Sequence, residues 1–223
     1  LKFIDDKKTV QSGVSVLSLY KTFFQYIKMG PNLIIKNRRL TYLYIFVTLM
    51  GFVSSPLMVF WSVYLNQIDS SFSYMYLSMV WFLIQLSIIA GNQILEIAGM
   101  YAERKKILTI TFLIFGISIL LMNIKKGLLA AVFLICIQEI VWSMISSIQR
   151  GLLNDYIDDQ TRATMISFSS LFHAAGKITA SLLFGFLADK FSILFAWTLS
   201  GLLSLLTVWF VHIMYKELVS GNE

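Results

Sequence analysis

The sequence predicts an all-α membrane protein built as a bundle of six transmembrane helices, and three observations predict this fold class. Hydrophobic residues make up 57% of the 223-residue chain and charged residues only 13%, whereas about a quarter of the residues in a soluble domain are usually charged. The mean hydropathy is +0.75. Six apolar runs follow one another, and each approaches the roughly 20 residues with which a helix crosses the hydrocarbon core of a membrane.

Residues 1–40 differ from the rest of the chain because they are polar and basic. We expect them to form a cytoplasmic linker that belongs to a longer or processed polypeptide. Apolar residues recur in this segment at three- and four-residue steps, which predicts an amphipathic helix on the membrane surface. A solvated linker with weak helicity is the alternative. The residues of this apolar stripe are Val14, Leu17, Tyr20, Phe24 and Ile27.

Residues 41–223 are predicted to form the six-helix bundle and a short cytoplasmic C-terminal tail. The connections between the apolar runs are short, so successive helices are expected to be antiparallel neighbours. The third run is the shortest of the six. The spans are expected at 41–65, 72–97, 107–122, 127–149, 163–188 and 192–214.

Basic residues are distributed unevenly between the two sides of the predicted bundle. If both chain ends lie on one side, that side holds fourteen of the eighteen lysines and arginines, and the opposite side holds only Lys125, Lys126 and Lys190. Because positive residues accumulate on the cytoplasmic side, we expect a multi-pass protein of the cell (plasma) membrane with both termini in the cytoplasm. This topology explains the net charge of +6 without nucleic acid as a partner.

Ionisable residues inside the predicted spans are candidates for a functional site. Lys177 lies near the middle of the fifth span, where a lysine costs about 3 kcal/mol, and Glu139 lies at a similar depth in the fourth span. Adjacent antiparallel helices would bring these two side chains together, with His173 one turn from Lys177 on the same face. We expect a buried acid–base cluster that either binds substrate or protons at a central cavity or only fixes the helix register. Gln85 and Gln138 are further candidates for a substrate or proton pathway.

Three segments of the sequence carry recognisable patterns. Residues 154–167 read NDYIDDQTRATMIS, a polar helix end followed by Arg-Ala-Thr and a serine that opens the next span. The fifth span ends in a Gly-x-x-x-Asp pattern from Gly185 to Asp189. Residues 99–106 read GMYAERKK, a degenerate form of Gly-x-x-x-Asp-Arg-x-Gly-Arg in which Glu103 replaces the aspartate. Together these segments resemble bacterial permeases of the major facilitator superfamily, and the drug-efflux-like members in particular.

The resemblance implies that the chain is the C-terminal half of a major facilitator fold, helices seven to twelve, with residues 1–40 as the central cytoplasmic loop. It implies a secondary active transporter that exports a small molecule by alternating access, coupled to protons, together with an N-terminal six-helix half. It also implies a cytoplasmic gate, with Glu103, Arg104, Arg162 and Asp158 as candidates for the latch. Because an arginine at a helix N-terminus opposes the helix dipole, Arg162 is expected to pair with Asp155, Asp158 or Asp159, or with lipid phosphate.

The alternative function is a six-span membrane subunit that homodimerises, or a scaffold without transport activity of its own. An enzyme is not expected, because the sequence contains no Gly-x-Ser-x-Gly, no His-Glu-x-x-His and no glycine-rich phosphate loop. The chain has only two histidines, too few for a histidine metal cluster, so neither a metal nor another cofactor is expected. The expected partners are a small-molecule substrate, protons, the lipid bilayer and the N-terminal half of the transporter.

Overall fold

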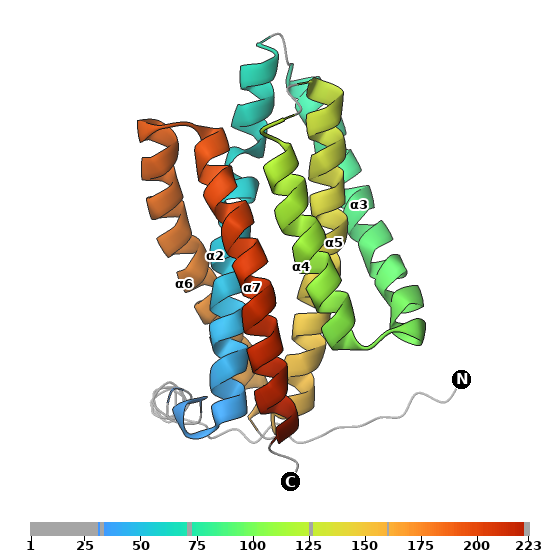
Figure 1. The fold of residues 1–223 in the computed structure, drawn as a ribbon, viewed down its shortest axis with the longest axis vertical. Coiled ribbons are helices and arrows are strands. Elements are labelled where there is room, and N and C mark those ends of the chain that lie inside the picture. Colours follow the sequence, from blue (N-terminus) through green and yellow to red (C-terminus); the bar gives the residue numbers. More distant parts are fainter. Residues whose placement is uncertain (1–30, 32–33, 71–72, 125–126, 160, 221–223) are drawn as a thin grey trace, which may run out of the picture.

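The computed structural model describes residues 31, 34–70, 73–124, 127–159 and 161–220 (Figure 1). These described residues form one long helix at each of the six predicted spans and contain no strand. The prediction of an all-α bundle is confirmed. The apolar stripe expected to form an amphipathic helix within residues 1–40 lies outside the described residues. The six helices are α2 (Arg38–Ile68), α3 (Tyr74–Tyr101), α4 (Arg104–Leu121), α5 (Leu128–Tyr156), α6 (Arg162–Lys190) and α7 (Ile193–Ser220).

Five helices of the described chain are long and apolar enough to cross a membrane, namely α2, α3, α5, α6 and α7. The remaining helix, α4, falls short of this measure because it has only 18 residues and begins with Arg104, Lys105 and Lys106. Its apolar part nevertheless packs inside the bundle, against α5 and α7. The expectation that α4 also crosses the membrane therefore stays a prediction.

The helices extend further into the polar connections than the apolar runs predicted. Helix α5 continues to Tyr156 and α7 to Ser220, and the basic cluster that begins at Arg104 belongs to α4 and not to the preceding loop. The connections between the second and third spans and between the fourth and fifth spans are therefore shorter than predicted. Polar and charged side chains are compatible with a helix at the membrane interface, so hydropathy marks the apolar part of a helix and not its end.

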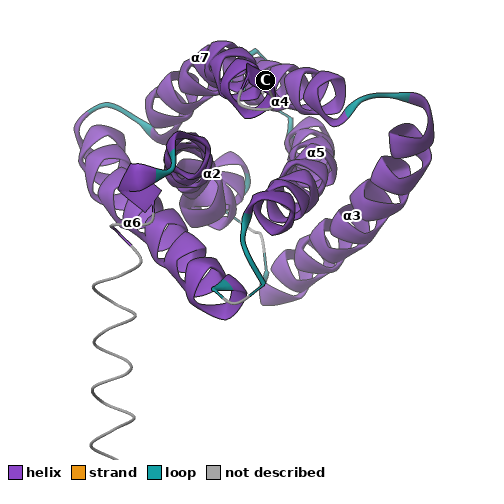
Figure 2. Cartoon of the chain, turned by 90° about the horizontal axis from the view of Figure 1, so that it is seen from below, coloured by secondary structure: helices purple, strands orange, loops and turns teal. Residues whose placement is uncertain are grey.

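Helices α2 and α5 occupy the centre of the arrangement. Helix α2 packs against α5, α6 and α7, while α5 packs against α3 and α4, and α4 packs against α7. Viewed along the bundle, α3 and α6 lie on opposite flanks with α2 and α5 between them (Figure 2). Helices α5 and α6 follow each other in the chain, yet in the described residues they do not form a close pair. The expectation that these two helices are packed neighbours is wrong, because each packs against α2 and they do not pack closely against each other.

Glycines allow α2 and α6 to pack with their backbones in contact. A Cβ atom on Gly51 would overlap the carbonyl oxygen of His173, and one on Gly176 would overlap the carbonyl oxygen of Thr48. Small residues let membrane helices approach closely in this way. The close approach fixes the position of the N-terminal half of α6, and with it the position of His173.

Hydrogen bonds from buried side chains join α2 to its neighbours. The hydroxyl group of Tyr44 donates to the carbonyl oxygen of Met165 in α6 at 2.6 Å. The indole nitrogen of Trp197 in α7 donates to the carbonyl oxygen of Pro56 at 3.0 Å. Inside hydrocarbon no water competes for these polar groups. The two bonds therefore hold α2 against both α6 and α7.

Candidate functional site

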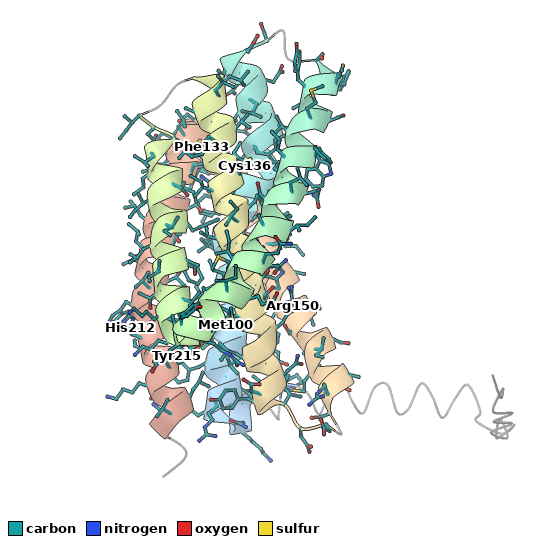
Figure 3. The ribbon with its side chains drawn as sticks, turned by 90° about the vertical axis from the view of Figure 1, so that its right-hand side faces the viewer. Met100, Phe133, Cys136, Arg150, His212 and Tyr215 are labelled. Carbon is teal, nitrogen blue, oxygen red and sulfur yellow. The ribbon has the colours of Figure 1, made fainter. Side chains whose placement is uncertain are left out.

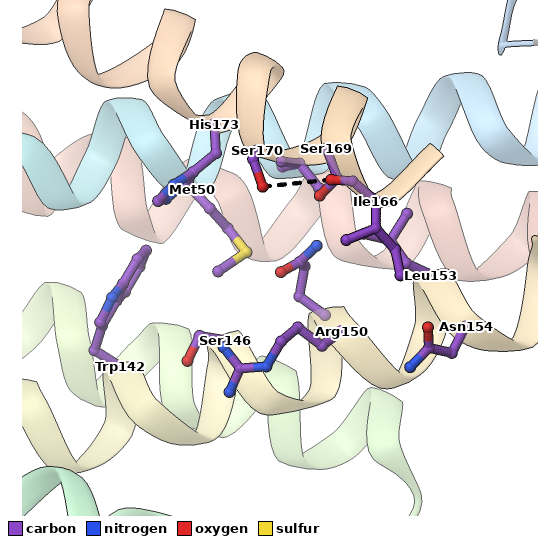
Figure 4. Close-up of a pocket in the computed structure, with 12 residues that line it drawn as sticks. Met50, Trp142, Ser146, Arg150, Leu153, Asn154, Ile166, Ser169, Ser170 and His173 are labelled. Carbon is purple, nitrogen blue, oxygen red and sulfur yellow. Dashed lines mark hydrogen bonds between the residues drawn. The ribbon is translucent and has the colours of Figure 1, made fainter. Parts of the chain in front are cut away.

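A cavity of about 280 Å³ lies between α5 and α6, and α2 lines the remaining side (Figure 4). It lies in the half of the bundle next to the α5–α6 connection, because its lining comes from the C-terminal half of α5 and the N-terminal half of α6. This space is open because α5 and α6 do not pack closely against each other. The lining residues are Val47, Met50, Trp142, Ser146, Gln149, Arg150, Leu153, Asn154, Ile166, Ser169, Ser170 and His173.

The α5 wall of the cavity is a polar helix face. Ser146, Arg150 and Asn154 follow one another at four-residue spacing, which places them on one side of the helix. Trp142 continues this face one turn further from the α5–α6 connection. In Figure 4 these four side chains lie along α5, across the cavity from those of α6.

The α6 wall carries hydroxyl groups and an imidazole. Ser169, Ser170 and His173 are three and four residues apart, so they share the face of α6 that is directed toward α5. The hydroxyl group of Ser170 donates to the carbonyl oxygen of Ile166 at 3.3 Å (dashed line in Figure 4). The two walls together present hydroxyl, amide, imidazole and guanidinium groups to the same space.

Two polar side chains of the α5 wall have unused hydrogen-bonding capacity. Gln149 is only 8% exposed, and its Nε2 atom has no hydrogen-bond partner within the described chain. The guanidinium of Arg150 donates to the hydroxyl group of Ser147 at 2.9 Å, but no carboxylate of the described residues lies within 4.0 Å of it. Arg150 lies toward the α5–α6 end of α5, far from Cys136 near the other end (Figure 3).

The predicted acid–base cluster lies beyond the cavity, near the middle of the helices. Lys177 interacts electrostatically with both Glu139 and His173. Its ammonium group lies 3.5 Å from the sulfur of Met58, and no ion pair within 4.0 Å joins it to Glu139 in the described structure. Both side chains are half-buried, not fully buried. The three residues are thus brought to one region, and only His173 lines the cavity.

The two glutamine candidates do not reach the cavity. Gln85 is exposed on α3, the flank opposite α6, and Gln138 is completely buried. Neither end of the Gln138 amide has a hydrogen-bond partner among the described residues. The position of α3 at the edge of the bundle turns Gln85 outward, while the helical rotation of α5 turns Gln138 into the packed interior.

Replacing Gln138 with leucine is expected to stabilise the bundle, because a buried amide without partners costs about 1–3 kcal/mol and leucine is apolar and of similar size. The free energy of unfolding in mixed micelles is expected to rise by about 1–3 kcal/mol. The matched control is Gln85→Leu, which changes an exposed glutamine and is expected to have no comparable effect. A lower stability of Gln138→Leu would show that the amide has partners in the folded protein.

The charged residues predicted for a cytoplasmic latch lie together at the end of the bundle that holds the α3–α4 and α5–α6 connections. Arg104 forms an ion pair with Asp155, which joins α4 to α5, and Arg162 pairs with Asp159, one of its three expected partners. Glu103 precedes α4 and is exposed, as is Asp158. Exposed ion pairs of this kind contribute about 0–1 kcal/mol, so they are available for exchange with other charges.

Sequence reasoning missed the lining residues Gln149 and Arg150. Arg150 was counted only among the basic residues that set topology. A signal was present, because Ser146, Arg150 and Asn154 recur at the spacing of one helix face. The apolar run was taken to end at residue 149, which hid the continuation of α5 through this polar face.

No protein-family model matches the sequence, and no curated protein matches it significantly.

Proposed function

We propose that this chain is the C-terminal half of a secondary active transporter of the major facilitator type, which moves a small molecule across the cell membrane by alternating access. The observation that carries the proposal is the pair of polar faces that α5 and α6 direct at each other inside an otherwise apolar bundle. The cavity between these faces supports the proposal, because it brings polar groups of two helices to one space inside the bundle.

The polar faces extend from the cavity to the middle of the helices. Glu139 lies two helical turns before Ser146 on α5, and Lys177 lies two turns after Ser170 on α6. A spacing of seven residues keeps each pair on the same face. Ionisable residues within membrane spans usually mark ion or substrate pathways, since they are costly elsewhere. Glu139 and Lys177 are therefore the proposed inner end of a pathway whose cytoplasmic part is the cavity.

A second half is proposed because α3 and α6, the two helices that flank the bundle, are the least buried of the five membrane-compatible helices. Apolar side chains such as Phe82 on α3 and Leu171 on α6 are exposed on these flanks. In the proposed transporter an N-terminal six-helix half covers the open cavity between α5 and α6 and closes the pathway, and rocking of the two halves alternates its opening. Arg104, Glu103, Arg162 and Asp158 are the proposed cytoplasmic latch between the halves.

The same exposed flanks also support the alternative, a six-span subunit that pairs with a second copy of itself. The molecular mass of the purified protein in detergent distinguishes the two arrangements. A complex of two identical chains with no further component would favour the homodimer. A complex with a different six-span chain, or a covalent continuation of this one, would favour the transporter of two unlike halves.

The function itself is tested by flux. Inside-out membrane vesicles that contain the chain together with its partner half are energised with a proton gradient and assayed with two probes, the lipophilic cation ethidium and the organic anion 2-naphthoate. We expect gradient-dependent accumulation of at least one probe, abolished by a protonophore and absent from vesicles that lack the protein. Equal accumulation in both kinds of vesicle would contradict the proposal. Flux by this chain alone would contradict the need for a second half.

A further inference from the structure

We propose that the cavity between α5 and α6 binds an amphipathic anion, with Arg150 as its counter-charge and Gln149 as a hydrogen-bond donor. The inference names the substrate class of the proposed transporter. The transport of the bound molecule rests on the proposed function, whereas its binding to the cavity does not.

The charge of the cavity favours an anion. Its lining contains the guanidinium of Arg150 and no aspartate or glutamate. Of the nearby carboxylates, Asp155 pairs with Arg104, and Glu139 lies beyond the cavity. Arg150 is exposed at the edge of the cavity, and a guanidinium there forms charge-assisted hydrogen bonds with an anion. Within the described chain Arg150 has no such partner, and a bound anion would supply one.

The hydrogen-bond donors point to the same ligand chemistry. A buried amide nitrogen without a partner is unfavourable. The Nε2 atom of Gln149 is such a group, enclosed behind the cavity wall. A rotation of the side-chain amide would bring it to an acceptor oxygen of a ligand in the cavity. The planar guanidinium of Arg150 presents several N–H donors, an arrangement that suits carboxylate and phosphate groups. Adjacent positions on α5 thus offer an amide donor and a charged donor to one anionic group.

The other lining residues set the character of the rest of the ligand. Val47 and Met50 of α2, Leu153 of α5 and Ile166 of α6 provide apolar surface, and Trp142 adds an aromatic ring. The volume of about 280 Å³ is near the lower end of the range for small-molecule sites. The ligand that fits is therefore a small apolar body, such as one or two rings, that carries an anionic group. A carboxylate metabolite and the headgroup region of an anionic lipid both have this chemistry.

Binding of a matched series of probes tests the proposal. The detergent-solubilised protein, with its partner half, is equilibrated with 2-naphthoate, 2-naphthamide and 2-naphthylmethylammonium, which share one ring system and differ in charge. We expect saturable binding of the naphthoate. The affinity for the amide and for the cation is expected to be lower by about tenfold or more, because a hydrogen bond to a charged group contributes about that factor. Equal binding of the three probes would overturn the proposal.

Variants locate the site. Arg150→Gln and Gln149→Leu are expected to weaken naphthoate binding by about tenfold, whereas Arg150→Lys keeps the charge and is expected to retain part of the affinity. The matched control is Arg38→Gln, which removes an arginine at the same end of the bundle but outside the cavity. Each variant is checked for monodispersity by size exclusion. Unchanged naphthoate binding in folded Arg150→Gln, or an equal loss in Arg38→Gln, would contradict the assignment.

Competition distinguishes the two sources of the anion. If phosphatidylglycerol displaces naphthoate and phosphatidylcholine does not, the resident anion is a lipid headgroup; if neither lipid displaces it, the site serves a soluble organic anion.

The flux assay separates this inference from the proposed function. Ethidium flux without naphthoate binding would refute the anion site and leave transport standing. Naphthoate binding without any flux would refute transport and leave the binding site standing.

Discussion

Replacing Gly176 with alanine is expected to separate α2 from α6 and to lower the free energy of unfolding by about 1–3 kcal/mol, the usual cost of overpacking. The new methyl group would overlap the backbone carbonyl of Thr48, and a backbone atom cannot rotate away as a side chain can. The helices must therefore move apart, which also disturbs the reciprocal contact of Gly51 with His173. Unfolding in mixed micelles measures the loss.

The same helix offers a matched control. A Cβ atom on Gly185 would meet nothing within 4 Å, so Gly185→Ala adds the same methyl group to α6 without a clash. Alanine is also the better helix former by about 1 kcal/mol, and the stability of this variant is expected to be unchanged or slightly higher. Similar destabilisation by the two substitutions would contradict the close packing of α2 against α6.

Replacing Glu139 with glutamine is expected to reduce flux in the complete transporter strongly, because ionisable residues within membrane spans usually mark ion or substrate pathways. Glutamine has nearly the same shape as glutamate but neither carries a charge nor takes up a proton. The carboxylate of Glu139 has no hydrogen bond within the described residues, and its charged neighbour there is Lys177. The flux of whichever probe the wild-type protein moves, measured at equal protein content in the vesicles, gives the result.

Glu96→Gln is the control for this substitution. Glu96 is exposed on α3 and does not line the cavity, so its neutralisation is expected to leave flux unchanged. Both variants are expected to insert at wild-type levels. Normal flux in Glu139→Gln would reject a role for this carboxylate in substrate binding or coupling, and would leave a purely structural role in fixing the register of α5 and α6.

Much of the fold is predictable from the sequence, because each apolar run corresponds to one helix and the polar interruptions correspond to the connections. The helix ends are less predictable. Tyr156 and Ser220 end helices that continue past their apolar parts, since charged and polar residues do not interrupt a helix at an interface. Helix neighbours also depend on tertiary packing. The packing of α2 against α6 depends on glycine contacts such as that of Gly176 with Thr48. The partner of such a glycine in another helix cannot be read from the sequence.

The candidate site is only partly predictable for the same reason. His173 was expected from its spacing to Lys177 and does line the cavity. Gln85 was expected at the right depth, but depth along a helix does not determine which way the side chain faces, and α3 turns it outward. Gln149 and Arg150 lie near a helix end, where polar residues are common, so their types alone do not predict a site. They become candidates only because the space between α5 and α6 makes them lining residues of the cavity.

Cysteine accessibility at Ser146 tests most directly whether the space between α5 and α6 is a water-filled cavity within the membrane that opens toward the cytoplasm. The single native cysteine, Cys136, is first replaced with alanine, and Ser146→Cys is compared with Ile114→Cys, which places a cysteine on an exposed apolar position of α4. A charged maleimide applied to either face of sealed vesicles is expected to label position 146 from the cytoplasmic face and to leave position 114 unlabelled. Protection of position 146 from both faces, or equal labelling at position 114, would contradict the cavity.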